Sequence, residues 1–163
     1  MPIVIVDDTA EDALLAHRVF AQCKIRNPIT LLNGGAACLE YFSEMAAFES
    51  RKLPCLLLLD VMMPVVSGID VLTGILAGKM GEGSLVVMLS GITELKTIHR
   101  GYQLGAKTFL IKPITTQDVV HMLNSLPELE ARHSPEGYEL ALRTAEQRSD
   151  PRRTGSQIRA FHA

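Results

Sequence analysis

Short apolar runs and longer amphipathic stretches alternate five times along the chain. Each run is too short for a helix, and four of the five are nearly continuous in apolar residues, as expected of β-strands that are covered on both faces. The predicted strands span residues 2–6, 29–32, 55–59, 85–89 and 108–111.

The stretches between these runs are long enough for helices and carry apolar residues at helical spacing. In the first stretch Leu15, Val19 and Phe20 share one face, and in the last Thr115 or Thr116 is placed to cap the helix. The predicted helices span residues 10–23, 36–48, 69–76, 94–104 and 116–126. Repeated strand–helix alternation predicts an α/β fold: a doubly wound, five-stranded parallel sheet with helices on both faces.

The amino-acid composition of the chain changes after Leu126. Residues 127–163 contain prolines, glycines and charges of both signs, six Lys or Arg against six Asp or Glu. We therefore divide the chain into a domain at 1–126 and a C-terminal tail at 127–163. A short helix is predicted near Ser134-Pro135, with Tyr138, Leu142 and Ala145 on one face, and the rest of the tail is expected to be flexible. This tail is a candidate for homodimer or partner contacts.

Charge and cysteine content narrow the functional classes. A net charge of −2 gives no electrostatic footprint for DNA or an anionic membrane. The chain shows no signal peptide and no apolar run near the ~20 residues that span a membrane. Cys23, Cys38 and Cys55 are odd in number and lack C-x-x-C spacing, so we expect buried free thiols in a reducing cytoplasm.

Polar residues follow four of the predicted strands: Asp7-Asp8, Asp60, Ser90-Gly91 and Lys112-Pro113. Singly, each has a structural explanation, such as a helix cap at Asp8 or a solvated charge at Lys112. Parallel strands, however, bring their carboxyl ends to one edge of the sheet, which is where ligands bind in such folds. Crowded carboxylates need a cation, and an oxygen-only ligand set with neither His nor Cys suits Mg²⁺ rather than zinc.

Such an edge is suited to phosphoryl chemistry. A carboxylate such as Asp60 can attack a phosphoryl group and form an aspartyl phosphate. The reaction needs positioning and neutralisation of charge, which a metal between Asp8 and Asp60 and the ammonium of Lys112 would supply. The hydroxyl of Ser90 could take a further phosphoryl oxygen.

Four segments together resemble the receiver (CheY-like) domain of two-component response regulators. They are VIVDD at 4–8, LLLLDVMMPVVSG at 56–68, MLSG at 88–91 and FLIKP at 109–113. The resemblance covers residues 2 to about 126 in the order and spacing of the family. It implies a flavodoxin-like sheet of strand order 2-1-3-4-5 and a bacterial signalling protein that is not an enzyme beyond self-dephosphorylation.

The resemblance also implies a role for individual residues. Asp60 would be the phosphoacceptor. Lys112, at the end of the fifth strand, would pair with the phosphoryl group, and its peptide bond to Pro113 would be cis. Ser90 and Phe109 would be the switch residues, and Gly68 would allow a tight turn into the third helix. Mg²⁺ would be held by Asp7, Asp8, Asp60 and the backbone carbonyl of Met62.

Two positions depart modestly from the family pattern, with opposing consequences. Gly91 replaces the more usual alanine and opens the site to water, whereas Met62 offers no side-chain donor to orient an attacking water. The first change is expected to shorten the lifetime of the phosphorylated state and the second to lengthen it.

The partners that the resemblance implies are a sensor histidine kinase or a phosphotransfer protein. The long segment before the third strand and the lack of an effector domain resemble stand-alone receivers, including those that pair with phytochrome-type kinases. Leu14 and Arg18 are candidate docking residues for this partner, with an ordinary helix face as the alternative. The output face would comprise Lys96, His99, Arg100, Gln103 and the surroundings of Phe109. The 37 residues after Leu126 are too few for a winged helix, which favours a stand-alone receiver without a DNA-binding domain.

Three alternatives remain at this stage. A haloacid dehalogenase-type phosphohydrolase would need a second acid two residues after Asp60, where Met62 stands. A flavodoxin-like nucleotide-binding module would need a glycine-rich phosphate loop after the first strand, where carboxylates stand instead. A degenerate receiver would act by protein contact alone, although all the acceptor-site residues are present.

Overall fold

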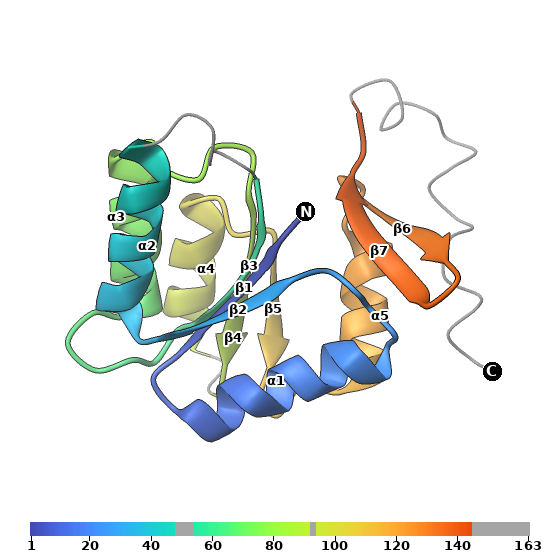
Figure 1. The fold of residues 1–163 in the computed structure, drawn as a ribbon. Coiled ribbons are helices and arrows are strands. Elements are labelled where there is room, and N and C mark those ends of the chain that lie inside the picture. Colours follow the sequence, from blue (N-terminus) through green and yellow to red (C-terminus); the bar gives the residue numbers. More distant parts are fainter. Residues whose placement is uncertain (48–53, 92–93, 145–163) are drawn as a thin grey trace.

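The computed structural model describes residues 1–47, 54–91 and 94–144 (Figure 1). Five parallel strands form one sheet in the order β2-β1-β3-β4-β5. The strands are β1 (Ile3–Asp7), β2 (Ile29–Asn33), β3 (Leu56–Asp60), β4 (Leu85–Ser90) and β5 (Thr108–Ile111). The predicted α/β class, the flavodoxin-like architecture and the strand order are confirmed.

Helices cover both faces of this sheet (Figure 1). The helices are α1 (Ala10–Gln22), α2 (Gly35–Ala47), α3 (Gly68–Ala77), α4 (Leu95–Gln103) and α5 (Thr116–Ser125). The first and last pack on one face, and the other three pack on the opposite face. Each end of these helices and of the five sheet strands lies within one residue of its predicted position.

The central strands contribute to two cores at once. In β3, Leu56 and Leu58 face the core beneath α1 and α5, while Leu57 and Leu59 face the core beneath α2, α3 and α4. All four leucines are fully buried. This arrangement explains the continuous apolar run, because neither face of the strand is left to solvent.

One predicted helix face needs correction. Leu15 was expected to face the core together with Val19 and Phe20, but its side chain is 40% exposed. The inward face of α1 instead carries the small residues Ala13 and Ala16, which let the helix approach the sheet closely. Leu15 is left at the margin of this face.

The described part of the predicted tail is a β-hairpin, so the predicted short helix is wrong over residues 134–142. Strands β6 (Leu129–Ser134) and β7 (Gly137–Leu142) pair antiparallel. Ser134, Pro135 and Gly137 occupy positions that favour them in a type I turn, and the sequence therefore carried a signal for a hairpin. Ala145 and the residues after it lie outside the described residues, and the boundary at 126/127 stays a prediction.

Contacts with the α1–β2 connection hold the hairpin in its strand conformation. The backbone N–H of Tyr138 donates to Lys24 O at 2.8 Å, and the N–H of Arg26 donates to Tyr138 O at 2.9 Å. Gly137 has a φ of +150°, and a Cβ there would lie 2.1 Å from Lys24 O. A glycine is therefore required where the hairpin meets the body of the domain.

Asn27 fastens the hairpin from within. Its amide Nδ2 donates to Leu140 O and to Met1 O, and its Oδ1 accepts from Leu140 N at 2.7 Å. The side chain of Asn27 is buried, and Leu129 and Leu140 of the hairpin are fully buried in the α1–α5 core. The hairpin is therefore packed into the core beneath α1 and α5.

We expect Asn27→Ala to lower the free energy of unfolding by about 1–3 kcal/mol, because it leaves buried backbone groups of Leu140 without partners. Urea denaturation of the full chain measures this change. Asn124→Ala, at an exposed position of α5, is the matched control and should change stability by less than about 0.5 kcal/mol. Equal stability of the two variants would contradict the anchoring role of Asn27.

None of the helices in the part of the chain that the structure describes is both long enough and apolar enough to cross a membrane.

Candidate functional site

The candidate site lies where the strand order of the sheet reverses. The chain passes from β1 outward to β2 and then back across to β3, so the carboxyl ends of β1 and β3 lie side by side at the switch point. In open α/β sheets this is the position at which ligands bind. The residues that end these two strands are Asp7 and Asp60.

Asp60 is buried, and each of its carboxylate oxygens has a partner. Oδ1 accepts a hydrogen bond from the backbone N–H of Met62 at 3.1 Å, and Oδ2 accepts one from Lys112 Nζ at 2.9 Å. Only 3% of the residue is exposed. The ion pair with Lys112 and the local backbone turn therefore hold this carboxylate at the end of its strand.

Lys112 contacts three carboxylates at once. Besides Asp60, its Nζ lies 2.5 Å from Asp7 Oδ2 and 3.2 Å from Asp12 Oδ2. The contact with Asp7 is an ion pair without hydrogen-bond geometry, whereas those with Asp60 and Asp12 are hydrogen bonds. The Lys112–Pro113 peptide bond is cis, as predicted from the family resemblance.

The electrostatics of the pair Asp7 and Lys112 follow from burial. Burial raises the pKa of Asp7, and the Lys112 ammonium and the Thr9 N–H lower it only in part. Burial alone would lower the pKa of Lys112, but its ion pairs with Asp7, Asp60 and Asp12 outweigh this effect and raise the pKa. Lys112 therefore stays charged across the physiological range, and Asp7 is a carboxylate for which a further cation would be favourable.

The acidic residues fit a divalent cation. Carboxylate oxygens of Asp7, Asp8 and Asp60 lie within 4.8 Å of one another, and Asp8 reaches this cluster from the exposed side. Asp7 Oδ2 is a buried oxygen that has no hydrogen-bond partner in the structure. Hard divalent ions bind such oxygens, and Mg²⁺ takes one or two carboxylates while keeping several waters.

The two predicted switch residues lie on neighbouring strands. Ser90 is buried at the end of β4, and its carbonyl accepts from the backbone N–H of Lys112 at 3.0 Å. Phe109 on β5 is half-buried and lies against the Tyr102 ring at 5.2 Å between centroids. A Cβ on Gly101 would lie 2.5 Å from the Phe109 ring, so α4 approaches this ring closely. Ser90 thus lies at the same carboxyl edge of the sheet as the site residues, and the Phe109 ring is packed against α4.

The loop from β3 to α3 turns sharply around the site. Ser67 caps α3 in a reciprocal capping box with Asp70, and the Gly68 N–H donates to Val61 O at 3.1 Å. A Cβ on Gly68 would lie 2.2 Å from Asp60 O. Gly68 is therefore required because the backbone approaches Asp60 closely where the loop turns into α3.

Val65, at the outermost point of this loop, has a φ of +67° and is fully exposed. A β-branched residue in the left-handed region is strained by about 1–2 kcal/mol. We expect Val65→Asn to raise the free energy of unfolding by about 1 kcal/mol, because asparagine tolerates this conformation. Chemical denaturation tests this, with Val65→Thr as a β-branched control that should leave stability unchanged. A loss of stability in Val65→Asn would contradict the strain.

Asp12 was not singled out from the sequence. It lies in the first turn of α1, where the helix dipole favours an acidic side chain. This ordinary role accounts for an acid at this position, so the sequence does not indicate its contact with Lys112. The available signal was its place in the first turn of α1, five residues after the end of β1 at Asp7.

The predicted partner and output surfaces are exposed. Leu14 is 46% exposed on α1, next to the exposed Arg18. On α4, Lys96, His99 and Arg100 are exposed, and Gln103 Nε2 lies 3.4 Å from His99 Nε2. Large apolar side chains accompany this α4–β5 surface, namely Leu95, Tyr102 and Ile111. These surfaces are available for contact, and their roles stay predictions.

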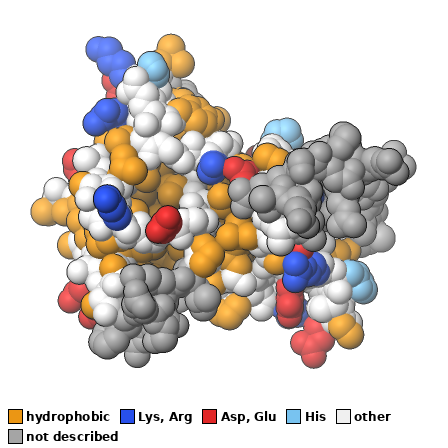
Figure 2. Space-filling model, turned by 90° about the horizontal axis from the view of Figure 1, so that it is seen from above, with side chains coloured by type: hydrophobic (Ala, Val, Ile, Leu, Met, Phe, Trp, Pro, Cys, Tyr) orange, Lys and Arg blue, Asp and Glu red, His pale blue; other side chains and the backbone are white. Residues whose placement is uncertain are grey.

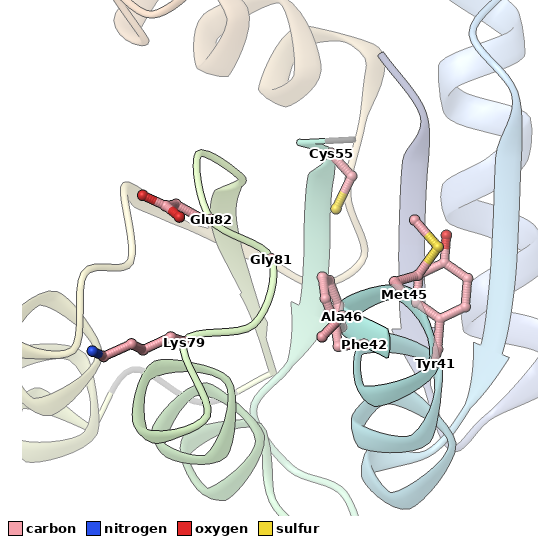
Figure 3. Close-up of a pocket in the computed structure, with 8 residues that line it drawn as sticks. All are labelled: Tyr41, Phe42, Met45, Ala46, Cys55, Lys79, Gly81 and Glu82. Atoms are coloured by element: carbon pink, nitrogen blue, oxygen red, sulfur yellow. The ribbon is translucent and has the colours of Figure 1, made fainter. Parts of the chain in front are cut away.

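A separate cavity of about 250 Å³ lies at the opposite, amino-terminal end of the strands. Figure 2 views this end of the molecule and shows hydrophobic side chains gathered in its middle. In the close-up, Cys55 lies between Lys79 and Glu82 on one side and Met45 on the other (Figure 3). Burial raises the pKa of the Cys55 thiol, so it is protonated at neutral pH. None of the predicted site residues lines this cavity, and the candidate site remains at the carboxyl edge.

All three cysteines are free and buried, as predicted. Burial, with a smaller contribution from Cys55, raises the pKa of the Cys38 thiol to about 12. These thiols are therefore packing residues of low nucleophilicity.

A five-stranded parallel sheet with an Asp-rich carboxyl edge and a lysine at that edge defines a receiver-type signalling domain. Comparison with protein families confirms this: the chain belongs to the response regulator receiver domain family, which it matches over residues 3–124. Members of this family are phosphoacceptor signalling proteins of two-component systems. They interact with histidine kinases or phosphotransfer proteins and bind Mg²⁺ at an acidic pocket.

Individual relatives are distant but cover most of the chain. The probable methanogenesis regulatory protein FilR2 of Methanothrix harundinacea is 29% identical over 77% of this chain and 81% of its own length. Among solved structures, the bacteriophytochrome response regulator RtBRR is 26% identical, with a TM-score of 0.70 over 83% of this chain and 82% of that one. The bacteriophytochrome response regulator AtBRR is also 26% identical, with a TM-score of 0.64 over 77% and 91%.

Proposed function

We propose that this protein accepts a phosphoryl group on Asp60 from a sensor histidine kinase or a phosphotransfer protein, with Mg²⁺ bound at Asp7, Asp8, Asp60 and the Met62 carbonyl. The observation that carries the proposal is the hydrogen bond between Lys112 and a buried Asp60 inside a cluster of carboxylates. A carboxylate held in this way is oriented as a nucleophile and is accompanied by a fixed positive charge.

Asp60, Lys112 and Ser90 have different roles in the phosphoryl transfer. An Asp60 oxygen forms the new bond to phosphorus while the bond from phosphorus to the donor breaks, and the donor leaves with that electron pair. Lys112 neutralises charge on the phosphoryl oxygens, and Ser90 supplies a hydroxyl to one of them. Bound Mg²⁺ would add charge neutralisation at the same oxygens. Hydrolysis of the aspartyl phosphate by water returns Asp60 and inorganic phosphate.

We further propose that the phosphorylated state is transmitted by protein contacts at α4, β5 and α5. Exposed apolar side chains interspersed with basic ones on this surface support the proposal, since such mixtures occur at transient interfaces. Similarity to two bacteriophytochrome response regulators favours a phytochrome-type kinase as the donor. Buried free thiols are compatible with a cytoplasmic location. A homodimer is a further proposal.

The direct test uses acetyl phosphate as a small phosphoryl donor. Full-length protein with acetyl phosphate and Mg²⁺ should gain one acid-stable, base-labile phosphate per chain, detected by intact-mass spectrometry. Omission of Mg²⁺ with added chelator should prevent the gain. A protein that stays unmodified with Mg²⁺ present, and that also fails to bind beryllofluoride, would refute the proposed function.

A further inference from the structure

The ammonium group of Lys112 is closely surrounded by carboxylates in this structure. A lysine has three N–H donors, and carboxylate oxygens of Asp7, Asp60 and Asp12 lie within 3.2 Å of its Nζ. A phosphoryl oxygen can therefore pair closely with Lys112 only if one of these carboxylates gives way.

The three carboxylates differ in their freedom to move. The side chains of Asp7 and Asp60 are 1% and 4% exposed and end central strands of the sheet, whereas that of Asp12 is 46% exposed. Asp12 also has the longest contact with Lys112. It is the carboxylate that can be displaced without disturbing the sheet.

Space for this displacement adjoins the contact. Asp12 and Lys112 together line an open cavity of about 310 Å³, whose other walls include Leu15, Gly91 and Pro113. Gly91 leaves room there, because a Cβ at this position would meet nothing within 4 Å. The Asp12 side chain can therefore turn toward solvent while its helix stays in place.

We propose that Asp12 is a positioning residue that occupies, in the resting protein, the place on Lys112 that a phosphoryl oxygen takes after transfer. Phosphorylation of Asp60 exchanges one anion for another: Lys112 leaves Asp12 and pairs with the phosphoryl group. Asp12 opposes this exchange in two ways, by competing for Lys112 and by repelling an anionic donor. The inference rests on the proposed function and assigns a regulatory contact to α1 at the same site.

The exchange also carries information to α1. The Asp12 carboxylate ties the first turn of this helix to β5 through Lys112 in the resting state, and the tie is released when the phosphoryl group arrives. The residues around Asp12 are thus expected to change their surroundings on phosphorylation, although they do not touch the phosphoryl group.

Asp12→Asn tests the proposal, with beryllofluoride and Mg²⁺ as the phosphoryl analogue on full-length protein. Removal of one half-exposed ion pair should tighten beryllofluoride binding by about two- to fivefold, measured by fluorine NMR titration, and should raise the initial rate with acetyl phosphate in proportion. Asp12→Glu should return both values toward wild type. Glu11→Gln removes the same charge from the same exposed helix turn without a contact to Lys112, and should change binding less than Asp12→Asn.

A spectroscopic readout separates displacement from general charge repulsion. Backbone amide signals of residues 11–13 should shift when beryllofluoride binds wild type and should shift much less in Asp12→Asn. Equal effects of Asp12→Asn and Glu11→Gln, or unchanged or weaker beryllofluoride binding in Asp12→Asn, would overturn the inference. Absence of binding in wild type would instead overturn the proposed function, and the inference with it.

Discussion

Asp60→Asn is expected to abolish phosphate incorporation from acetyl phosphate while leaving the protein folded. The amide has nearly the shape of the carboxylate and can keep the hydrogen bond from the Met62 N–H, but it is not a nucleophile toward phosphorus. Intact-mass spectrometry should find wild type with about one phosphate per chain and the variant at background, because only one carboxylate attacks. Circular dichroism should show that the variant keeps the fold of the wild type.

Asp8→Asn is the companion variant that separates nucleophile from metal ligand. Asp8 belongs to the carboxylate cluster but has its side chain on the exposed side, and Asp60 stays intact in this variant. Phosphate incorporation should therefore become slower and should recover in part at higher Mg²⁺ concentration, whereas Asp60→Asn should not recover at any concentration. Phosphate found on Asp60→Asn at the wild-type level would place the acceptor elsewhere.

The fold was predictable because its signals are local and agree with one another. The continuous apolar strands exist because helices cover both faces of the sheet, and the helix ends coincide with turn and cap residues such as Thr115, whose side chain accepts from Asp118 N. The place of the site was also predictable, because parallel strands bring their carboxyl ends to one edge of the sheet, and this puts Asp7, Asp60 and Lys112 at that edge.

The hairpin and Asp12 escaped prediction because tertiary contacts decide them. The segment from Ser134 onward has apolar residues at a spacing that a helix could also use. Besides the turn residues at its start, its pairing with β6 and its contacts with the α1–β2 connection through Asn27 and Tyr138 favour strands. Asp12 has an ordinary role at a helix start, and its contact with Lys112 joins residues 100 positions apart in the chain. Contacts over such a separation are not encoded in a local pattern.

The site also shows why a buried acceptor needs its surroundings. Asp7 and Asp60 are nearly excluded from water, and a single ammonium balances them together with Asp12. One positive charge among these three negative charges leaves the edge with a net negative charge. The same imbalance that favours a divalent cation would oppose an incoming phosphoryl group in the absence of that cation.

Gly68→Ala is expected to impair the site through the backbone of Asp60. The added Cβ would lie 2.2 Å from Asp60 O and 3.1 Å from the Met88 side chain, so β3 or the start of α3 must move. A misplacement on the order of 1 Å at a reacting group can cost about 100-fold in rate, and overpacking of this kind costs about 1–3 kcal/mol of stability. Phosphorylation rates with acetyl phosphate and urea denaturation measure the two effects.

Gly91→Ala is the matched control for this prediction. Gly91 also follows a strand at the site edge, but a Cβ there would meet nothing within 4 Å and its backbone shows no positive φ. The free energy of unfolding of Gly91→Ala should therefore differ from wild type by less than about 0.5 kcal/mol. The phosphorylation rate of this variant should stay far closer to wild type than that of Gly68→Ala. If Gly68→Ala matched Gly91→Ala in both measurements, the close approach of α3 to the acceptor backbone would not be what demands a glycine. The expected contrast would show that the acceptor is positioned by backbone packing as well as by its ion pair with Lys112.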